Sequence, residues 1–370
     1  MVRRWRAEWL AMGGQFGAWS MAHPPMLRRW VRTVARAGAS RGPATTLPAG
    51  AVSPPAPTRP GLDPLDTMDM SSAQALGHAD TALRCGVCGH QAPAAEAARI
   101  RCNVRRFRDR QFGVWRCAGC ASLHCEPVAD LDAYYAGYPI RAQRLDYFTR
   151  SWYREVLRRL TAAGLSKAHR VLDYGCNQGL FIDFLRECGY ADCAGYDPFV
   201  ERFQDRAVLE RRYDWVVCLD VIEHDRAPGE FLARLVGLLR PGGTLCLETP
   251  NAQGIDLGRA EDYLHAIHVP YHVHILSESG LRGMARGLGL DELAVYRRWY
   301  MDTWPPGTAR RLFEGLMWHA GNDLDVGYEP PRLGLFLRHP SLFVHLFLGY
   351  WLHEGKTDHM MVMLRAPAAP

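Results

Sequence analysis

The stretch RVLDYGCNQGLFIDFLRECGYADCAGYDPF, residues 170–199, decides the fold of this chain. An apolar run leads into a glycine-containing turn and then into an apolar pattern of helical period, which predicts a strand, a tight turn and a helix. A dinucleotide loop would carry three glycines as GxGxxG, but here Asn177 stands between Gly175 and Gly179. Asp173 precedes the turn, where a phosphate would need only backbone N–H groups. The added carboxylate indicates a ligand with a cationic or amino group.

Strand-like and helix-like segments alternate through the second half of the chain. Short apolar runs predict strands, and 3.6-residue periodicity predicts helices. The strands are expected at residues 192–197, 213–220, 243–250, 291–299 and 358–366, and the helices between them at 230–239 and 281–290. This alternation predicts an α/β fold with a parallel sheet and helices on both faces.

At this point the sequence resembles the class I S-adenosylmethionine-dependent methyltransferases. The motifs that carry the resemblance are VLDYGCNQG, GYDP, YDWVVCLDVIEH and LLRPGGTLCLETPN, in the expected order. The resemblance covers about residues 165–300 and 358–366. It implies a Rossmann-like, seven-stranded sheet that binds S-adenosylmethionine.

The resemblance also implies roles for individual residues. Asp173 would organise the methionine amino group, and Asp197 would bind the ribose hydroxyls. Gly175 and Gly179 would allow the cofactor to approach the backbone. The cofactor-binding set that we expect is Asp173, Gly175, Cys176, Asn177, Gly179, Asp197 and Asp220.

One segment departs from the family pattern. Only 14 residues separate Pro198 from Tyr213, so the third strand is expected to be compressed or missing. Asp205 is a candidate for the adenine contact, although an acid on a solvated helix explains it as well. The alternative fold, a nicotinamide-binding domain with a degenerate loop, gives no role to the later LDVIEH and RPGG elements.

The residues after the fourth and fifth strands are expected to face the transferred methyl group, because ligands bind beyond the carboxyl ends of the strands. The fourth strand ends in Asp220-Val-Ile-Glu223-His224, and the fifth ends in Glu248-Thr-Pro-Asn251. An oxygen or carbon nucleophile must lose a proton. His224 is the candidate base, because the unperturbed pKa of histidine lies near neutral pH, and Glu223 would orient it or act itself.

Further resemblances leave the chemistry of this segment open. The acid-x-x-Glu-His pattern resembles the ubiquinone-pathway O-methyltransferases and the small-RNA 2′-O-methyltransferases, which implies a second divalent metal held by Asp220, Glu223, His224 and His272. A resemblance to sugar C-methyltransferases makes Glu223 and His224 a proton-handling pair instead. A purely structural role is the third alternative. His265 and His274, in the same four-histidine loop as His268, are expected on a polar surface.

A cysteine-rich module precedes the sheet domain. Two CxxC pairs, Cys85 with Cys88 and Cys117 with Cys120, are separated by 28 residues. Such knuckles predict a closed, tetrahedral four-cysteine site for structural Zn²⁺, with rubredoxin-like iron or unligated core cysteines as alternatives. The spare candidates Cys102, Cys125, His90 and His124 are expected to be bystanders.

The remaining segments complete the expected organisation. Residues 1–80 form a disordered or untranslated leader, with Met68 or Met70 as candidate starts, and residues 81–127 form the zinc ribbon. A helical connector at 128–165 joins the ribbon to the methyltransferase domain at 166–370. That domain carries an insertion at 302–357 before its last strand, which we expect to form a lid, with 340–353 available for a membrane surface or a dimer contact.

Composition and motifs together predict a methyltransferase acting on a small polar or glycosylated acceptor, such as a sugar or polysaccharide precursor, at oxygen or carbon. The 44 Lys and Arg against 39 Asp and Glu are too balanced to indicate nucleic-acid binding. Basic residues interleaved with aromatic residues in the ribbon nevertheless suit RNA binding, so an rRNA methyltransferase is the alternative function. A non-catalytic zinc-ribbon scaffold protein is the alternative that is not an enzyme. The odd total of 11 cysteines and the CxxC pairs indicate thiolate–metal chemistry in a reducing, cytoplasmic location, and no apolar run is long enough to cross a bilayer.

Overall fold

The computed structural model describes residues 83–92, 97–128, 131–135, 143–297, 303–329, 332–352 and 357–368 of the 370-residue chain. All of them belong to the compact unit that spans Leu62–Pro370. The expected leader at 1–80, with Met68 and Met70, lies outside the described residues. A search of the described helices found none with the length and apolarity needed to cross a membrane.

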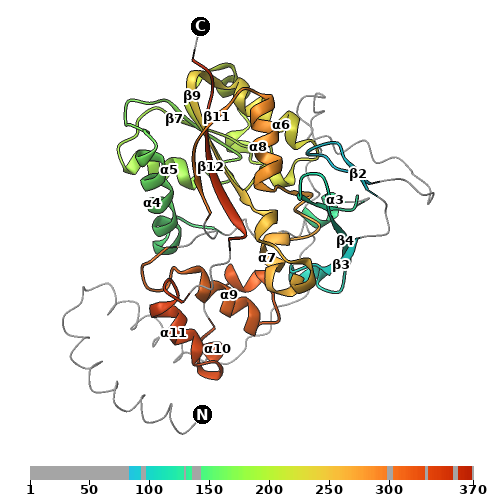
Figure 1. Cartoon of the computed structure of the whole chain (residues 1–370). Coiled ribbons are helices and arrows are strands. Elements are labelled where there is room, and N and C mark those ends of the chain that lie inside the picture. Colours follow the sequence, from blue (N-terminus) through green and yellow to red (C-terminus); the bar gives the residue numbers. More distant parts are fainter. Residues whose placement is uncertain are drawn as a thin grey trace, which may run out of the picture. The chain divides into compact units, whose positions relative to one another are not determined.

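A six-stranded sheet forms the centre of the fold (Figure 1). Its strand order is β11-β12-β9-β8-β6-β7. The strands are β6 (Val171–Tyr174), β7 (Cys193–Tyr196), β8 (Tyr213–Leu219), β9 (Leu239–Pro250), β11 (Asp291–Tyr296) and β12 (His359–Arg365). The first four are parallel to one another, and β12 runs antiparallel to both β9 and β11. The carboxyl ends of four strands therefore meet at one edge.

The expectation of seven strands is wrong for the described residues, which place six in this sheet. The segment after β7 forms two short 3-10 helices instead, η4 (Glu201–Phe203) and η5 (Arg206–Glu210). The segment between β7 and β8 is too short to form a further helix and the expected third strand and then to connect back to β8. Asp205 caps η5 by accepting a hydrogen bond from the backbone N–H of Ala207 at 3.0 Å.

Helices cover both faces of the sheet, as the alternation predicts (Figure 1). The helices α4 (Tyr147–Ala162) and α5 (Leu180–Glu187) share a buried cluster with Val171, Trp215 and Cys246. The opposite face shares a cluster with α6 (Pro228–Gly237) and α8 (Glu278–Gly287), through the neighbouring strand residues Leu172, Val216 and Leu245. Successive residues of one strand thus bury opposite faces, which explains why the central strands are apolar at nearly every position.

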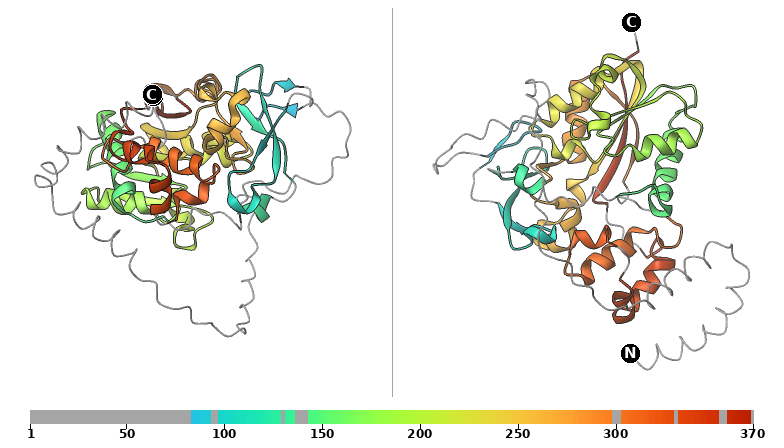
Figure 2. Two further views of the ribbon diagram at one scale, coloured as in Figure 1. Left: turned by 90° about the horizontal axis from the view of Figure 1, so that it is seen from below. Right: turned by 180° about the vertical axis from the view of Figure 1, so that it is seen from behind.

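The cysteine-rich module shares a sheet with the main domain. A four-stranded antiparallel sheet has the order β10-β5-β4-β3. Its strands are β3 (Ala98–Arg101), β4 (Gln111–Arg116), β5 (Leu123–Cys125) and β10 (His274–Ile275), and β1 (Leu83–Arg84) pairs separately with β2 (Gln91–Ala92). Since β10 follows β9 in the chain, strand pairing joins the module to the loop beyond the carboxyl ends of the main sheet (Figure 2).

Short helices lie around this junction. They are η2 (Arg105–Phe107), α3 (Leu131–Tyr135), η6 (Ile222–His224), η7 (Ala252–Gly254), η8 (Leu257–Tyr263) and α7 (Leu264–Ile267). One buried cluster contains Ile100 of β3, Ile267 of α7 and Tyr271. The module and the loop therefore share a hydrophobic core.

The segment between β11 and β12 forms a small helical subdomain at the edge of the main sheet where β12 begins (Figure 2). It contains α9 (Arg310–His319), η9 (Leu324–Gly327), α10 (Leu333–Arg338) and α11 (Ser341–Leu348), with its own buried cluster. Arg310 is buried and pairs with the fully buried Asp358 at 2.5 Å, just before β12. This ion pair fixes the first helix of the insertion to the last strand.

Candidate functional site

The turn after β6 has the geometry that a close ligand approach requires. Gly175 has φ +79°, and a Cβ there would lie 2.4 Å from Val221 Cγ2. Gly179 has φ +73° and begins α5, and its Cβ would lie 2.2 Å from the Phe203 ring. Asn177 also adopts a positive φ, of 47°. Only residues that tolerate left-handed backbone angles fit this turn.

Two predicted cofactor acids lie at the ends of β6 and β7. Asp197 accepts hydrogen bonds from the N–H of Asn177 at 2.9 Å and of Phe199 at 2.8 Å, so it also holds the turn in place. Asp173 is buried, and burial, with a smaller contribution from the charge of Asp197, raises its pKa to about 7. The side chain of Cys176 packs into the core, which leaves only its backbone for a ligand.

Three carboxyl groups gather at the ends of β8 and β9. Asp220 Oδ1, Glu223 Oε1 and Glu248 Oε2 are buried and have no hydrogen-bond partner in the described part of the chain. Burial raises the pKa of all three, to about 8 for Glu223 and about 7 for Glu248, and the charge of Glu248 raises the pKa of the other two further. Buried acids without partners are costly, and a cationic ligand would relieve that cost.

His224 lies in η6, directly beside these acids. Its Nδ1 is 2.9 Å from the carbonyl oxygen of Tyr271 and 3.0 Å from the hydroxyl of Tyr135. A carbonyl can only accept, so Nδ1 carries the hydrogen and Nε2 keeps a lone pair. Burial lowers the pKa of His224 to about 4. The expectation of a pKa near neutral is therefore wrong: the ring is neutral at pH 7, but it is a weaker base than its type implies.

A second histidine completes the group. His272 Nδ1 donates to the carbonyl of Ala266 at 2.8 Å, so its Nε2 also keeps a lone pair. That Nε2 lies 3.9 Å from Glu223 Oε1, while Glu223 Oε2 accepts a hydrogen bond from Thr249 at 3.0 Å. The ligand atoms of Glu223, His224 and His272 lie within 4.8 Å of one another. Asp220, the fourth predicted metal ligand, does not join this group among the described residues.

The expectation of a polar surface loop for His265 and His274 is wrong. His274 is buried, and His265 lies 3.1 Å from the buried carboxylate of Asp358. His268 is also buried and donates from Nδ1 to the side-chain oxygen of Asn103 at 2.7 Å. The signal in the sequence was the alternation of histidine with apolar residues, since Ile267, Val269, Tyr271 and Ile275 are all buried.

Tyr135 is a site residue that sequence reasoning missed. It lies at the end of α3, in the connector, and its ring meets the ring of His224 edge-on with centroids 6.2 Å apart. The insertion also reaches this region, because the carboxylate of Asp220 contributes to the raised pKa of Tyr328. No local spacing in the sequence links either tyrosine to the cofactor motifs.

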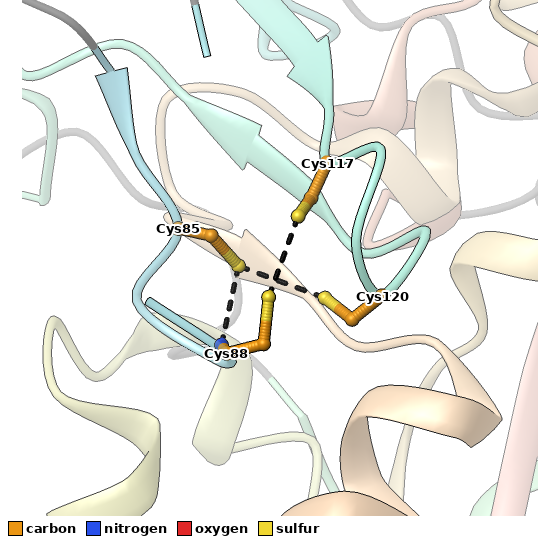
Figure 3. Close-up of side chains that lie close together, drawn as sticks. All are labelled: Cys85, Cys88, Cys117 and Cys120. Atoms are coloured by element: carbon orange, nitrogen blue, oxygen red, sulfur yellow. Dashed lines mark hydrogen bonds between the residues drawn. The ribbon is translucent and has the colours of Figure 1, made fainter. Parts of the chain in front are cut away.

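The four predicted cysteines, Cys85, Cys88, Cys117 and Cys120, converge on one centre and form what we call the four-cysteine cluster (Figure 3). Cys85 Sγ lies 3.6 Å from Cys120 Sγ, and Cys88 Sγ lies 3.6 Å from Cys117 Sγ. A tetrahedral site with Zn–S bonds of about 2.3 Å needs sulfur atoms about 3.8 Å apart, so the donor set fits. The remaining candidates Cys102, Cys125, His90 and His124 are not members of this cluster.

Comparisons with known proteins agree with this geometry. Residues 144–295 match the family model described as a methyltransferase domain. The ubiquinone biosynthesis O-methyltransferase of Roseobacter denitrificans is 28% identical over an alignment of 210 residues that covers 50% of this chain and 81% of that protein. The tRNA U34 carboxymethyltransferase of a Geobacter species is 33% identical over an alignment of 107 residues, but this alignment covers 23% of this chain and only 33% of that protein.

Among solved structures, a SAM-dependent methyltransferase from Archaeoglobus fulgidus aligns with 60% of this chain and 100% of its own, at 14% identity and a TM-score of 0.36. The family match spans the residues that form the cofactor turn and the Glu223–His224 segment. Residues 144–295 of this chain therefore form a methyltransferase domain of the S-adenosylmethionine-dependent type.

Proposed function

We propose that the protein methylates a hydroxyl group, or an acidic carbon, of a small polar or glycosylated acceptor such as a sugar precursor. The observation that carries this proposal is the gathering of Glu223, His224 and His272 beyond the ends of β8 and β9. Methyl transfer to such acceptors requires removal of a proton, and this group offers two imidazole lone pairs for it.

The cofactor would occupy the edge between the β6 turn and the β8 end. Its ammonium and sulfonium charges match the buried carboxyls of Asp173 and Asp220, whose pKa values are raised in the unliganded protein. Asp197 would still accept from the ribose hydroxyls, because a carboxylate oxygen has a second lone pair. Gly175, Cys176, Asn177 and Gly179 would contact the ligand through their backbone.

His224 is the proposed base. The acceptor O–H or C–H proton moves to His224 Nε2, and the acceptor electron pair forms the new bond to the methyl carbon. The carbon–sulfur bond breaks, and its electrons neutralise the sulfonium to give S-adenosylhomocysteine. Glu223, whose pKa is about 8, stays protonated at neutral pH in the unliganded protein and is less suited to be the base. Orientation of the two reactants supplies most of the rate gain.

A divalent metal is a second candidate for the same group. Glu223 Oε1 is buried without a partner among the described residues and lies near two imidazole lone pairs, so Glu223, His224 and His272 suit a metal ion. Such an ion would lower the pKa of an acceptor hydroxyl. Loss of activity in chelator, restored by one divalent ion, separates this mechanism from a metal-free base.

The four-cysteine cluster is proposed to hold structural Zn²⁺. Its sulfur separations suit a tetrahedral ion, and a site with four protein ligands leaves no position for catalysis. Free thiols at all four positions also support a reducing, cytoplasmic location for the protein.

Contacts of the cysteine-rich module favour a small acceptor over RNA. Arg99 pairs with Glu126, and Arg101 pairs with Glu261. Arg116 donates to the carbonyls of Ala121, Ala252 and Ile255. These three arginines of the stretch thus bind acids and carbonyls of the same chain. RNA remains the second acceptor class because of the tRNA-modifying relative, and it predicts salt-dependent RNA affinity.

The insertion is proposed to close over the acceptor, since it begins and ends at the ligand edge of the sheet. Exposed apolar side chains on and beyond α11 would also suit contact with a membrane surface or with a second copy of the chain. They are Phe343, Val344, Leu348, Trp351 and Leu352.

A labelled-methyl assay tests the function. S-adenosylmethionine with a labelled methyl group is offered with nucleotide sugars, quinone precursors and RNA as acceptors. Transfer to a sugar supports the proposal, and transfer to RNA alone replaces it. Binding of S-adenosylhomocysteine without transfer to any acceptor would favour a scaffold protein.

A further inference from the structure

A continuous chain of side-chain contacts links the four-cysteine cluster to the loop that carries the proposed base. Cys85 Sγ lies 3.1 Å from His124 Nε2, and His124 Nδ1 lies 2.8 Å from His274 Nδ1. His274 Nε2 donates to the carbonyl of Arg226 at 3.0 Å. Arg226 is two residues beyond His224. Two imidazole rings therefore span the whole distance from a cysteine of the cluster to the loop of the proposed base.

Backbone hydrogen bonds connect the same two regions in parallel with these side-chain contacts. His274 pairs with His124 across the β10–β5 ladder, and Cys125 N–H donates to the carbonyl of Val273 at 2.9 Å. Val273 N–H donates in turn to the carbonyl of Glu223 at 2.8 Å. A shift of the cysteine knuckle would thus reach Glu223 through the backbone and Arg226 through the rings.

The contact between the two sites is buried and close-packed. Cys85, His124 and His274 are 1%, 2% and 9% exposed. A Cβ at Gly86, inside the first knuckle, would lie 2.9 Å from His274 Nε2. A CxxC turn needs no glycine at this position for metal binding, so the absence of a side chain here makes room for the His274 ring.

The second knuckle is attached to the same domain. The carbonyl of Cys120 accepts from the hydroxyls of Ser277 and Ser279, the latter at 2.8 Å. Ser277 N–H donates to the hydroxyl of Ser122 at 3.0 Å, and Ser277 also caps α8. Both halves of the four-cysteine cluster are therefore fixed to the segment that contains His272 and His274.

We propose that His274 is a positioning residue that transmits the geometry of the metal-filled four-cysteine cluster to the Glu223–His224 loop. This inference rests on the proposed function. Filling the cluster fixes Cys85, and through His124 and His274 it holds the Arg226 carbonyl and the base beside it. Partners that orient a reacting group in this way typically change activity about ten- to a hundredfold when they are replaced.

Two substitutions of His274 each break one of the two contacts that this side chain makes, one with His124 and one with Arg226. In His274→Gln the amide nitrogen takes the place of Nε2 and keeps the bond to the Arg226 carbonyl. In His274→Asn the amide oxygen takes the place of Nδ1 as acceptor and keeps the contact with His124. We expect both to lower kcat about ten- to a hundredfold with the KM values within about twofold, because each breaks one link. His169→Gln, in the loop before β6 at the opposite edge of the sheet, is the control and should match the unchanged protein.

A spectroscopic measurement needs no acceptor. With Co²⁺ in the four-cysteine cluster, saturating S-adenosylhomocysteine should shift the visible absorption bands of the unchanged protein. The shift should be lost in both His274 variants although they still bind the ligand and hold one Co²⁺. Unmoved bands in the unchanged protein overturn the inference, as does full kcat in either metal-loaded variant. If no acceptor is methylated, the proposed function fails, but the cobalt titration still decides this inference.

Discussion

The raised pKa of Asp173 makes cofactor binding depend on pH. Asp173 has a pKa of about 7 in the unliganded protein because its carboxyl is buried at the end of β6. The ammonium of S-adenosylhomocysteine pairs only with the ionised carboxylate. At pH 8 about nine-tenths of the Asp173 groups are ionised, and at pH 6 about one-tenth. Affinity should therefore fall about tenfold between these values, which corresponds to about 1.4 kcal/mol.

Calorimetry measures both parts of this expectation. Titrations at pH 6, 7 and 8 give the affinity, and two buffers of different ionisation enthalpy give the protons released. At pH 7 about half of a proton should leave on binding, because half of the Asp173 groups still carry one. Glu223 has a raised pKa too, so Glu223→Gln is the matched control and should keep the pH dependence.

The substitution Asp173→Asn should weaken binding and remove the part of its pH dependence that Asp173 contributes over the same range. Equal affinity of the unchanged protein at pH 6 and pH 8, without proton release, would refute the assignment of Asp173 to the ammonium. Loss of the pH dependence in Glu223→Gln, but not in Asp173→Asn, would move the titrating group to the β8 end.

Three other substitutions, one of them with a matched control, test the reaction site, the insertion and the cluster. His224→Ala should lower kcat about 10²–10⁴-fold with S-adenosylhomocysteine affinity nearly unchanged, and a near-normal rate removes this ring from the chemistry. Asp358→Asn leaves the buried Arg310 with Glu314 as its remaining carboxylate partner and should lower the free energy of unfolding by up to about 3–5 kcal/mol in urea. Arg282→Gln, in a part-exposed ion pair, should cost under about 1 kcal/mol, and equal costs would contradict the burial argument. Cys88→Ser should abolish stoichiometric zinc measured by atomic emission, and full zinc content would exclude a site that needs all four cysteines.

The cofactor turn could be predicted from the sequence because its determinants are local. A strand, an acid and two glycines within one short stretch define a backbone path that few other residues could follow. The positive φ angles of Gly175, Asn177 and Gly179 follow from that path. The shortage of residues after Pro198 was visible in the same way, and its consequence is the replacement of the third strand by η4 and η5.

The histidine loop could not be predicted in this way. Its side chains are partnered by residues far away in the sequence: His268 by Asn103 and His274 by His124. The same holds for His224 in η6, which is partnered by Tyr135. A spacing rule works along one helix or strand and does not reach across such separations. The loop therefore resembled a polar surface segment until its partners were known.

By itself, the sequence determined the α/β class and the pairing of CxxC knuckles, because each depends on periodicity or spacing along a short piece of chain, and its motifs carried the resemblance to the methyltransferases. Only the tertiary structure decided which groups are charged and what holds them. The low pKa of His224 and the high pKa of Glu223 come chiefly from burial, which exists only once distant segments exclude water together. The same packing brings the four-cysteine cluster within two imidazole rings of the loop that carries the proposed base.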